Sequence, residues 1–252
     1  MMNDETGPGR SRGDQFEIGV QSYSFRNFSF EGSLKQLEAL GLSCMEFCAV
    51  HFPPDKDAPG FGTVLKTLRD AGVTVPAFGV EQFTDDVDAN RRKFEFAKAL
   101  GAGILSADPS PESFDNLETL CEEFDIEIAI HNHGPEARYD KVADTLDAVS
   151  GRNPKIGACV DTGHALRSSE MPDEVIRRLG ERVVLVHLKD WRVGGDEQIL
   201  GEGDMDLAGV AKALKEIGFA GPLIIEYENS PDNPVPDMKK GLANWRRAVE
   251  QA

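Results

Sequence analysis

The strict alternation of apolar and amphipathic segments constrains the fold of this chain more than any other feature. Eight short apolar runs have the length and composition of buried strands, and we expect strands at 16–23, 43–50, 73–80, 103–107, 126–131, 156–161, 183–188 and 222–228. The stretches between them carry a helical period, and we expect helices at 29–40, 63–71, 86–100, 111–124, 141–149, 171–180, 206–217 and 237–251. Such alternation requires a parallel sheet, and eight strand–helix units are the number that closes into a (β/α)8 barrel.

The length of 252 residues agrees with one such barrel, which typically needs about 250 residues. No linker or change of composition divides the chain, so we expect one barrel domain over 15–252. The polar, glycine-containing segment 1–14 has no apolar core of a signal sequence, and we expect a disordered leader there. No apolar stretch approaches the roughly 20 residues that cross a bilayer, so we expect no membrane partner.

The net charge of −17 comes from 44 acidic and 27 basic residues. Binding to a phosphate backbone requires a surface rich in lysine and arginine, so this balance argues against a nucleic-acid partner. Four cysteines lie in apolar strand or helix contexts. Without a secretory signal they are typical of reduced core residues in a cytoplasmic protein.

Four predicted strands end in residues that commonly bind metals. The strings IHNHG, VDTGH, VHLKD and IIEYE place His131, Asp161, His187 and Glu226 at these ends, 26 to 39 residues apart. In a parallel barrel all strand ends meet at one mouth. Two neutral imidazoles and two carboxylates suit one divalent ion, which we expect to be Mn, Co, Mg or Zn. The alternative for each residue taken alone is a buried, hydrogen-bonded side chain.

Strand parity places further polar side chains on the same inward faces. His133 is in phase with His131, and Lys189 is in phase with His187. His133 is therefore a candidate acid–base residue or a hydrogen-bond partner of the ligands. Lys189 is a candidate for holding a substrate or leaving oxygen, or for an ion pair with a strand-end glutamate. Glu46 would lie inside the second strand, where a buried carboxylate needs a partner, and we expect it in the pocket.

These strings resemble the xylose isomerase-like TIM-barrel superfamily, which includes ketose 3-epimerases, inosose dehydratases and AP endonucleases. The resemblance runs from IGVQSYSFR in the first strand to IIEYEN in the last, and VDTGH and VHLKD are among its most specific parts. It implies a single TIM barrel with the metal at the C-terminal mouth. It implies metal-ligand roles for Asp161, His187 and Glu226, and a role for His164 near the metal or on a substrate hydroxyl.

One position departs from the ketose epimerases, which carry a glutamate where this chain has His131. Epimerisation by two opposed glutamates would then need Glu46 or Glu136 to reach the pocket. A histidine here is similar to the inosose dehydratases. We therefore expect a metal-dependent sugar isomerase, epimerase or dehydratase that removes a proton α to a carbonyl of a keto-sugar or keto-inositol. The remaining assignments follow: the catalytic residues would be His133, Glu226 and Lys189, and the substrate-binding residues Glu46, His164, Glu136 and Trp191.

Two other functions stay open. An AP endonuclease-like repair enzyme would need a three-zinc cluster with a D-x-H pair ahead of the GEG loop, where this chain has Gly195 and Glu197. A catalytically silent barrel that binds a sugar at its mouth would keep the same ligand residues. The expected partner is a small sugar or polyol, and association into a homo-oligomer is left open.

Overall fold

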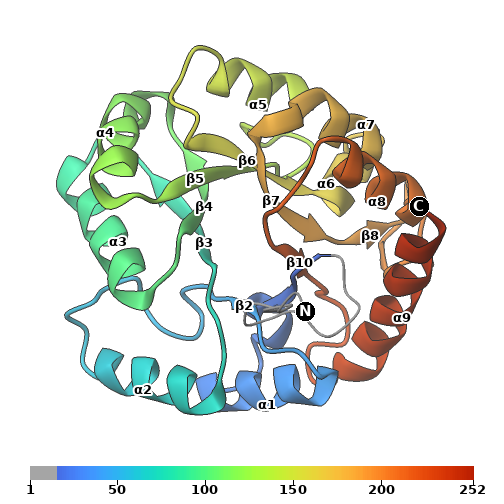
Figure 1. The fold of residues 1–252 in the computed structure, drawn as a ribbon, viewed down its shortest axis with the longest axis horizontal. Coiled ribbons are helices and arrows are strands. Elements are labelled where there is room, and N and C mark those ends of the chain that lie inside the picture. Colours follow the sequence, from blue (N-terminus) through green and yellow to red (C-terminus); the bar gives the residue numbers. More distant parts are fainter. Residues whose placement is uncertain (1–15) are drawn as a thin grey trace, which may run out of the picture.

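The structure is a computed structural model that describes residues 16–252. This part of the chain forms a barrel of parallel strands surrounded by helices (Figure 1). The segment expected to be a leader, 1–14, lies outside the described residues. The barrel strands are β1 (Ile18–Gln21), β2 (Met45–Glu46), β3 (Ala77–Phe83), β4 (Ile104–Pro109), β5 (Glu127–His131), β6 (Ile156–Asp161), β7 (Val183–Leu188) and β10 (Leu223–Ile225). The helices around them are α1 (Phe30–Leu40), α2 (Phe61–Ala71), α3 (Val87–Leu100), α4 (Phe114–Phe124), α5 (Val142–Val149), α6 (Thr162–Arg167), α7 (Pro172–Leu179), α8 (Leu207–Glu216) and α9 (Val235–Gln251).

Hydrogen bonds between the second and third strands close the sheet. The eight strands pair in the order β2-β1-β10-β7-β6-β5-β4-β3. The two ends of this order meet where Met45 N donates to Thr74 O at 3.0 Å and Gly79 N donates to Phe47 O at 2.9 Å. The predicted (β/α)8 barrel is therefore confirmed.

Local sequence signals explain where several helices begin and end. Asp86 and Asp206 precede α3 and α8, and each side chain accepts a hydrogen bond from a backbone amide of the first helical turn. Gly72 and Gly101 follow α2 and α3 with φ of 65° and 87°. Glycine adopts this left-handed conformation without the steric penalty of a Cβ, so it ends a helix before the next strand.

Two elements differ from the predicted order. Helix α6 begins directly after β6, because the side chain of Asp161 accepts a hydrogen bond from the backbone amide of His164. A small hairpin, β8 (Asp190–Trp191) with β9 (Glu197–Gln198), follows β7.

The last barrel strand is shorter than predicted, since Tyr227 N donates to Ser24 Oγ instead of a neighbouring strand.

The interior of the barrel is filled by two layers of side chains, each drawn from successive strands. The lower layer is a buried apolar cluster of its own, separate from the main core: Cys44, Ala77, Ile104, Ala129, Cys159, Leu185 and Ile224. Because strand residues two apart share a face, the next inward residue of each strand forms the upper layer: Glu46, Gly79, Ser106, His131, Asp161, His187 and Glu226. The main core lies between the strands and the helices, as the predicted parity requires.

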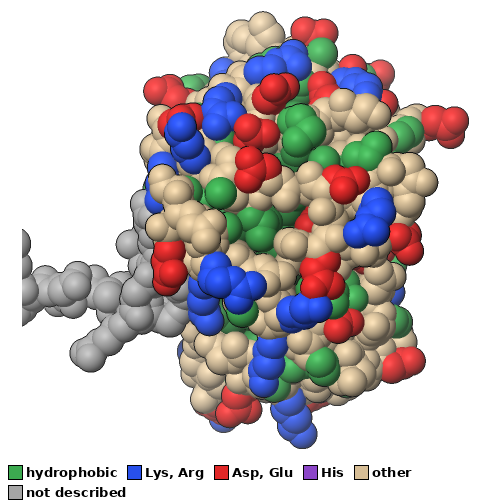
Figure 2. Space-filling model, turned by 90° about the vertical axis from the view of Figure 1, so that its right-hand side faces the viewer, with side chains coloured by type: hydrophobic (Ala, Val, Ile, Leu, Met, Phe, Trp, Pro, Cys, Tyr) green, Lys and Arg blue, Asp and Glu red, His purple; other side chains and the backbone are tan. Residues whose placement is uncertain are grey.

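Acidic and basic side chains alternate over the outer face drawn in Figure 2. Neighbouring helices pair some of these charges, as where Arg177 of α7 donates to Glu216 of α8 at 2.7 Å. Such exposed pairs contribute little stability each. Within residues 16–252, no helix is both long and apolar enough to span a bilayer.

Candidate metal centre

The four predicted ligand residues converge at the mouth of the barrel. His131, Asp161 and His187 end β5, β6 and β7, and Glu226 directly follows β10. These four strands are consecutive neighbours in the sheet. One ligand atom from each residue lies within 4.8 Å of all the others. Residues far apart in the sequence therefore form one compact donor set.

The spacing of the donor atoms agrees with a single small cation. His131 Nε2 lies 3.1 Å from His187 Nδ1, and Glu226 Oε2 lies 3.4 Å from the same His187 nitrogen. Asp161 Oδ2 is 3.7 Å from His131 Nε2. Ligands bound at about 2.0–2.2 Å around one tetrahedral ion would be separated by roughly 3.3 Å. The observed separations bracket that value.

The buried carboxylate of Asp161 provides a second test of whether these residues fit a metal ion. Asp161 is fully buried, and its Oδ2 has no hydrogen-bond partner among residues 16–252, whereas Oδ1 accepts from His164 N at 2.7 Å. Lys189 Nζ and His131 Nε2 are each 3.7 Å from Oδ2, which is beyond hydrogen-bond distance. A buried polar atom without a hydrogen bond costs free energy. The oxygen points toward the two facing imidazoles, so a cation between these groups would satisfy it. The residues present fit a divalent metal.

Glu46 orients one of the ligands. Its Oε2 lies 2.6 Å from His187 Nε2, and its Oε1 accepts a hydrogen bond from Ser106 Oγ at 2.5 Å. A carboxylate on the far nitrogen of a ligating histidine fixes the ring and its proton. The structure thus places Glu46 behind His187, where it contacts a ligand, rather than on the cavity wall expected for substrate binding.

Asn132 holds the end of β6 in place. Its side chain donates to Asp161 O at 2.9 Å and accepts from Asp161 N at 2.8 Å. Supporting roles for Asn132 and Ser106 could not be predicted from the sequence. Asn132 is out of phase with the inward face of its strand, and Ser106 stands in an otherwise ordinary apolar strand. Their hydrogen bonds to Asp161 and Glu46 on neighbouring strands become visible only in the folded barrel.

Opposite effects act on the two histidines of the candidate metal site. Burial lowers the pKa of His131 to about 4, so this ring is neutral at pH 7. Burial opposes the charged form of His187 too, but Cys159, Glu46 and Glu226 together raise the pKa of that imidazole well above its usual range. The Cys159 thiol, whose own pKa is raised by burial to about 12, is uncharged at pH 7. The carboxylates therefore hold the proton on His187.

A cavity of about 410 Å³ opens above the ligands. Its lining includes His131 and Glu226, three further predicted site residues, His133, His164 and Lys189, and the carboxylate of Glu228. The opposite wall has residues that the sequence analysis did not predict: Gln21, Tyr23, Cys48, Ala49, Val50, Gly79 and Val80. These side chains are small, apolar or neutral, so no charge pattern in the sequence indicated them.

Lys189 is a buried cation surrounded by carboxylates. It is 2 % exposed, and its Nζ lies 2.5 Å from Glu228, 3.2 Å from Glu226 and 3.7 Å from Asp161. Burial alone would lower the pKa of Lys189, but these three carboxylates raise it above its usual range. The same ammonium, with His187, holds the pKa of Glu226 below its usual range despite burial.

The tautomer of His164 is determined by Arg167. Arg167 Nη1 lies 2.7 Å from His164 Nδ1, and a guanidinium can only donate, so Nδ1 accepts and the ring proton belongs on Nε2. Burial lowers the pKa of His164 to about 4 and also lowers the pKa of His133. The guanidinium of Arg167 lies over the ring of Trp191, 5.0 Å from its centroid.

Two predicted substrate-binding residues lie away from the cavity wall. Trp191 packs against Arg167, and Glu136 is exposed; neither is among the described residues that line the cavity. A carboxylate near the mouth, Asp190, holds a loop. Asp190 accepts from Gly201 N at 2.8 Å and Gly203 N at 3.0 Å, which fastens the GEG loop.

Comparisons with known proteins agree with this architecture. The sequence profile of the family described as "Xylose isomerase-like TIM barrel" matches residues 34–248. The chain belongs to this family. It is 28% identical over 158 residues to the rhizopine catabolism protein MocC of Rhizobium meliloti, covering 54% of this chain and 48% of that protein. It is also 28% identical over 148 residues to an inosose dehydratase of Clostridium botulinum, covering 50% of this chain and 49% of that enzyme.

The chain spans about half the length of the curated relatives it matches. A solved structure described as the IOLI protein with a bound zinc atom superposes with a TM-score of 0.78 at 17% identity, covering 93% of this chain and 98% of that one. At this identity the likeness shows the shared fold.

Proposed function

We propose that this family member is a divalent-metal-dependent enzyme of the sugar isomerase and epimerase type, acting on a keto-sugar or keto-inositol. It would remove the proton α to the carbonyl, and we favour dehydration as the outcome. One observation carries the proposal: Asp161, whose Oδ2 has no hydrogen bond among residues 16–252, belongs to one compact donor set with His131, His187 and Glu226 directly beneath a cavity. Acid–base and cationic side chains line the same cavity.

His131, Asp161, His187 and Glu226 would hold one divalent ion. The inosose dehydratases among the relatives and the zinc in the structural neighbour support this choice of chemistry. When bound, the ion would withdraw charge from a substrate oxygen and so acidify the neighbouring carbon. Two imidazoles and two carboxylates leave Mn, Co, Mg and Zn as candidates.

His133 is the proposed base. Its ring stands 4.3 Å from the ring of His131, centroid to centroid, and it lines the cavity. Because burial lowers the pKa of His133, the imidazole is neutral at pH 7 and can accept a proton. His164, whose Nδ1 is occupied by Arg167, would donate its Nε2 proton in a hydrogen bond to a substrate hydroxyl.

Lys189 is the proposed donor to the leaving group. Its charged ammonium lies between Glu226 and Glu228 at the cavity wall. In a dehydration, His133 takes the α-proton, a carbon–carbon double bond forms, and the bond to the β-hydroxyl breaks. That oxygen, held by a hydrogen bond from the Lys189 ammonium, takes the proton from His133 and leaves as water, which restores the neutral imidazole.

The positions of the other glutamates favour dehydration over epimerisation by two opposed glutamates. Glu46 is fully buried and bonded to His187 and Ser106. Glu136 is exposed and is not among the described residues lining the cavity. Glu228 lines the cavity, but it stands two residues after Glu226 and its carboxylate pairs with Lys189. None of these three side chains is a free second glutamate of the kind that a symmetric mechanism on both faces of one carbon requires.

The decisive experiment follows a panel of keto-sugars and keto-inositols by proton NMR in D2O with metal-loaded protein. Exchange of the α-proton followed by loss of water is the expected result. His133→Asn should abolish both, and Glu226→Gln should behave in the same way. His51→Asn is the matched control, because His51 is the one histidine outside both the ligand set and the cavity lining. Full activity in both His187→Ala and Glu226→Gln would overturn the proposal.

A further inference from the structure

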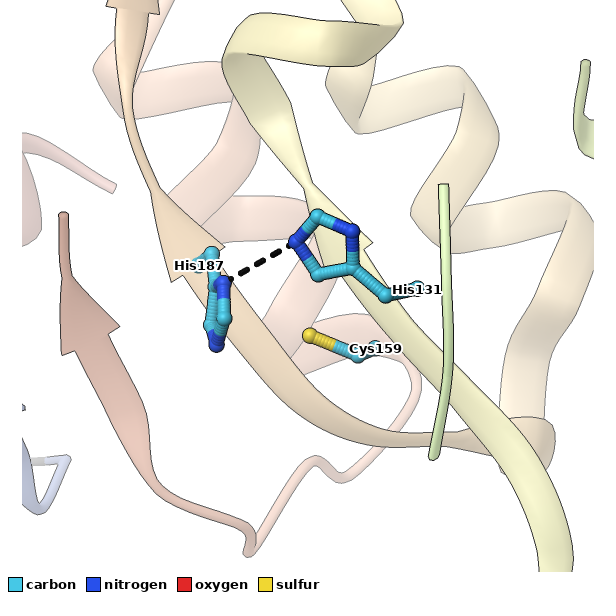
Figure 3. A group of neighbouring side chains, drawn as sticks. All are labelled: His131, Cys159 and His187. Atoms are coloured by element: carbon cyan, nitrogen blue, oxygen red, sulfur yellow. Dashed lines mark hydrogen bonds between the residues drawn. The ribbon is translucent and has the colours of Figure 1, made fainter. Parts of the chain in front are cut away.

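The thiol of Cys159 lies directly beneath the ligand set. Cys159 precedes Asp161 by two residues on β6 and is in register with His131 on the adjacent β5. Its sulfur points into the space between the imidazoles of His131 and His187 (Figure 3). The sulfur and one nitrogen of each ring all lie within 4.8 Å of one another. A sulfur atom one layer deeper than the carboxylates therefore converges with two nitrogen atoms of the upper layer.

The surroundings of Cys159 separate it from the cavity above. The residue is 1 % exposed, and it is not among the described residues that line the cavity. Cys44 is equally buried in the same lower layer, yet it belongs to no group of converging metal ligands in residues 16–252. The difference between the two cysteines is the pair of histidines, not burial.

The two donor sets suit different ions. Carboxylate oxygens favour hard or borderline cations, whereas thiolate favours thiophilic ones, and imidazole accepts both. We propose that His131, Cys159 and His187 form a second, alternative metal position, selective for thiophilic ions such as Cd²⁺. This proposal rests on the proposed function only because the second position shares His131 and His187 with the proposed metal centre.

Occupation of the deeper position has a chemical and a functional consequence. The ion binds as the Cys159 thiol and the His187 imidazolium each give up a proton to the buffer, and no oxidation state changes. Since both positions use His131 and His187, an ion in one excludes an ion from the other. An ion beside Cys159 would lie below the cavity floor, out of reach of substrate, so thiophilic ions should inhibit.

The test titrates metal-free protein with Cd²⁺ alone and records ultraviolet difference spectra. Wild-type protein should develop a sulfur-to-Cd²⁺ charge-transfer absorption that saturates with binding. Cys159→Ala should lose this absorption, and its affinity for Cd²⁺ should fall by more than about tenfold. Loss of a residue that only supports a ligand already lowers metal affinity by about that factor. Mn²⁺ binding by the same variant should be unchanged. Cys44→Ala, the matched control, should keep both the absorption and the affinity.

The possible failures are distinguishable. Cd²⁺ binding without the charge-transfer absorption would overturn the thiolate position and leave the carboxylate centre standing. An absorption lost equally in Cys44→Ala would also overturn it. Failure to bind either Cd²⁺ or Mn²⁺ would overturn the proposed metal centre as well. If Cys159→Ala does not fold, the 113Cd NMR shift of wild-type protein decides, because a sulfur ligand moves it far from a nitrogen–oxygen environment.

Discussion

The two interior layers of the barrel are made by the same strands, two residues apart, yet they differ completely in chemistry. On β7 the lower residue is Leu185 and the upper one is His187; on the following barrel strand they are Ile224 and Glu226. The lower layer is apolar and fully covered, whereas the upper layer holds buried carboxylates and imidazoles. The backbone is continuous between them, so position along the strand alone separates packing from chemistry.

This contrast teaches where stability and reactivity come from. Apolar side chains in the lower layer gain free energy by leaving water and filling space. The upper layer gathers groups whose burial is unfavourable without a partner, as the free Oδ2 of Asp161 shows. Substitutions in the two layers should therefore affect different measurements.

The largest expected effect comes from removing an upper-layer ligand. His187→Ala should lower metal content from about one ion per chain to none, because a tetrahedral site loses a donor. Turnover should fall by more than about 100-fold, because loss of a residue that only supports a ligand can already lower activity by that factor. Elemental analysis and activity assays measure these changes, with circular dichroism to verify the fold. Retention of the metal would mean that the histidine is structural and would remove the contrast between the layers.

A lower-layer truncation should act in the opposite way. Leu185→Ala should reduce the free energy of unfolding by about 2–5 kcal/mol, because the fully buried side chain leaves a cavity. Metal content at saturation should not change. Val193→Ala, at a residue 53 % exposed, serves as the control and should stay within about 0.5 kcal/mol of wild type. Urea denaturation of the metal-free proteins compares the three, and loss of metal in Leu185→Ala would contradict the separation of roles.

The smallest expected effect concerns the proton on His187. Glu46 and Glu226 raise the pKa of His187, so the ring is protonated at pH 7 in the metal-free protein, and a metal must displace that proton. Affinity should rise with pH until the raised pKa is passed. Calorimetric titrations in buffers of different ionisation enthalpy should detect about one proton released per ion.

Glu46→Gln is the matched variant for this measurement. The amide keeps the shape of the side chain but removes the charge, so the pKa of His187 should fall and fewer protons should be released. Metal affinity should drop by about ten- to hundredfold. In metal-free protein the raised pKa stabilises the fold below the unfolded value of about 6.5, and this contribution is lost as pH rises through the folded pKa. An unchanged proton release in Glu46→Gln would show that Glu46 does not act on His187.

The sequence by itself determined the barrel, its strand parity and the four strand-end residues that converge at the candidate metal site. Hydrophobic periodicity and helix-ending glycines act locally along the chain, and the ends of parallel strands must meet at one mouth, so His131 and Glu226 could be placed together from spacing alone. The family follows from the same strings, and the profile match over residues 34–248 confirms it.

Only the tertiary structure decided which side chains stand behind and beneath the ligands. Glu46 was predicted for the pocket but lies against His187, and the lower-layer Cys159 lies between two histidines on neighbouring strands. Arg167 and His164 meet within α6, a short helix that periodicity did not predict. The contacts of Glu46 and Cys159 depend on strand register and on the directions of side chains from different strands, and no pattern along a single segment contains that information.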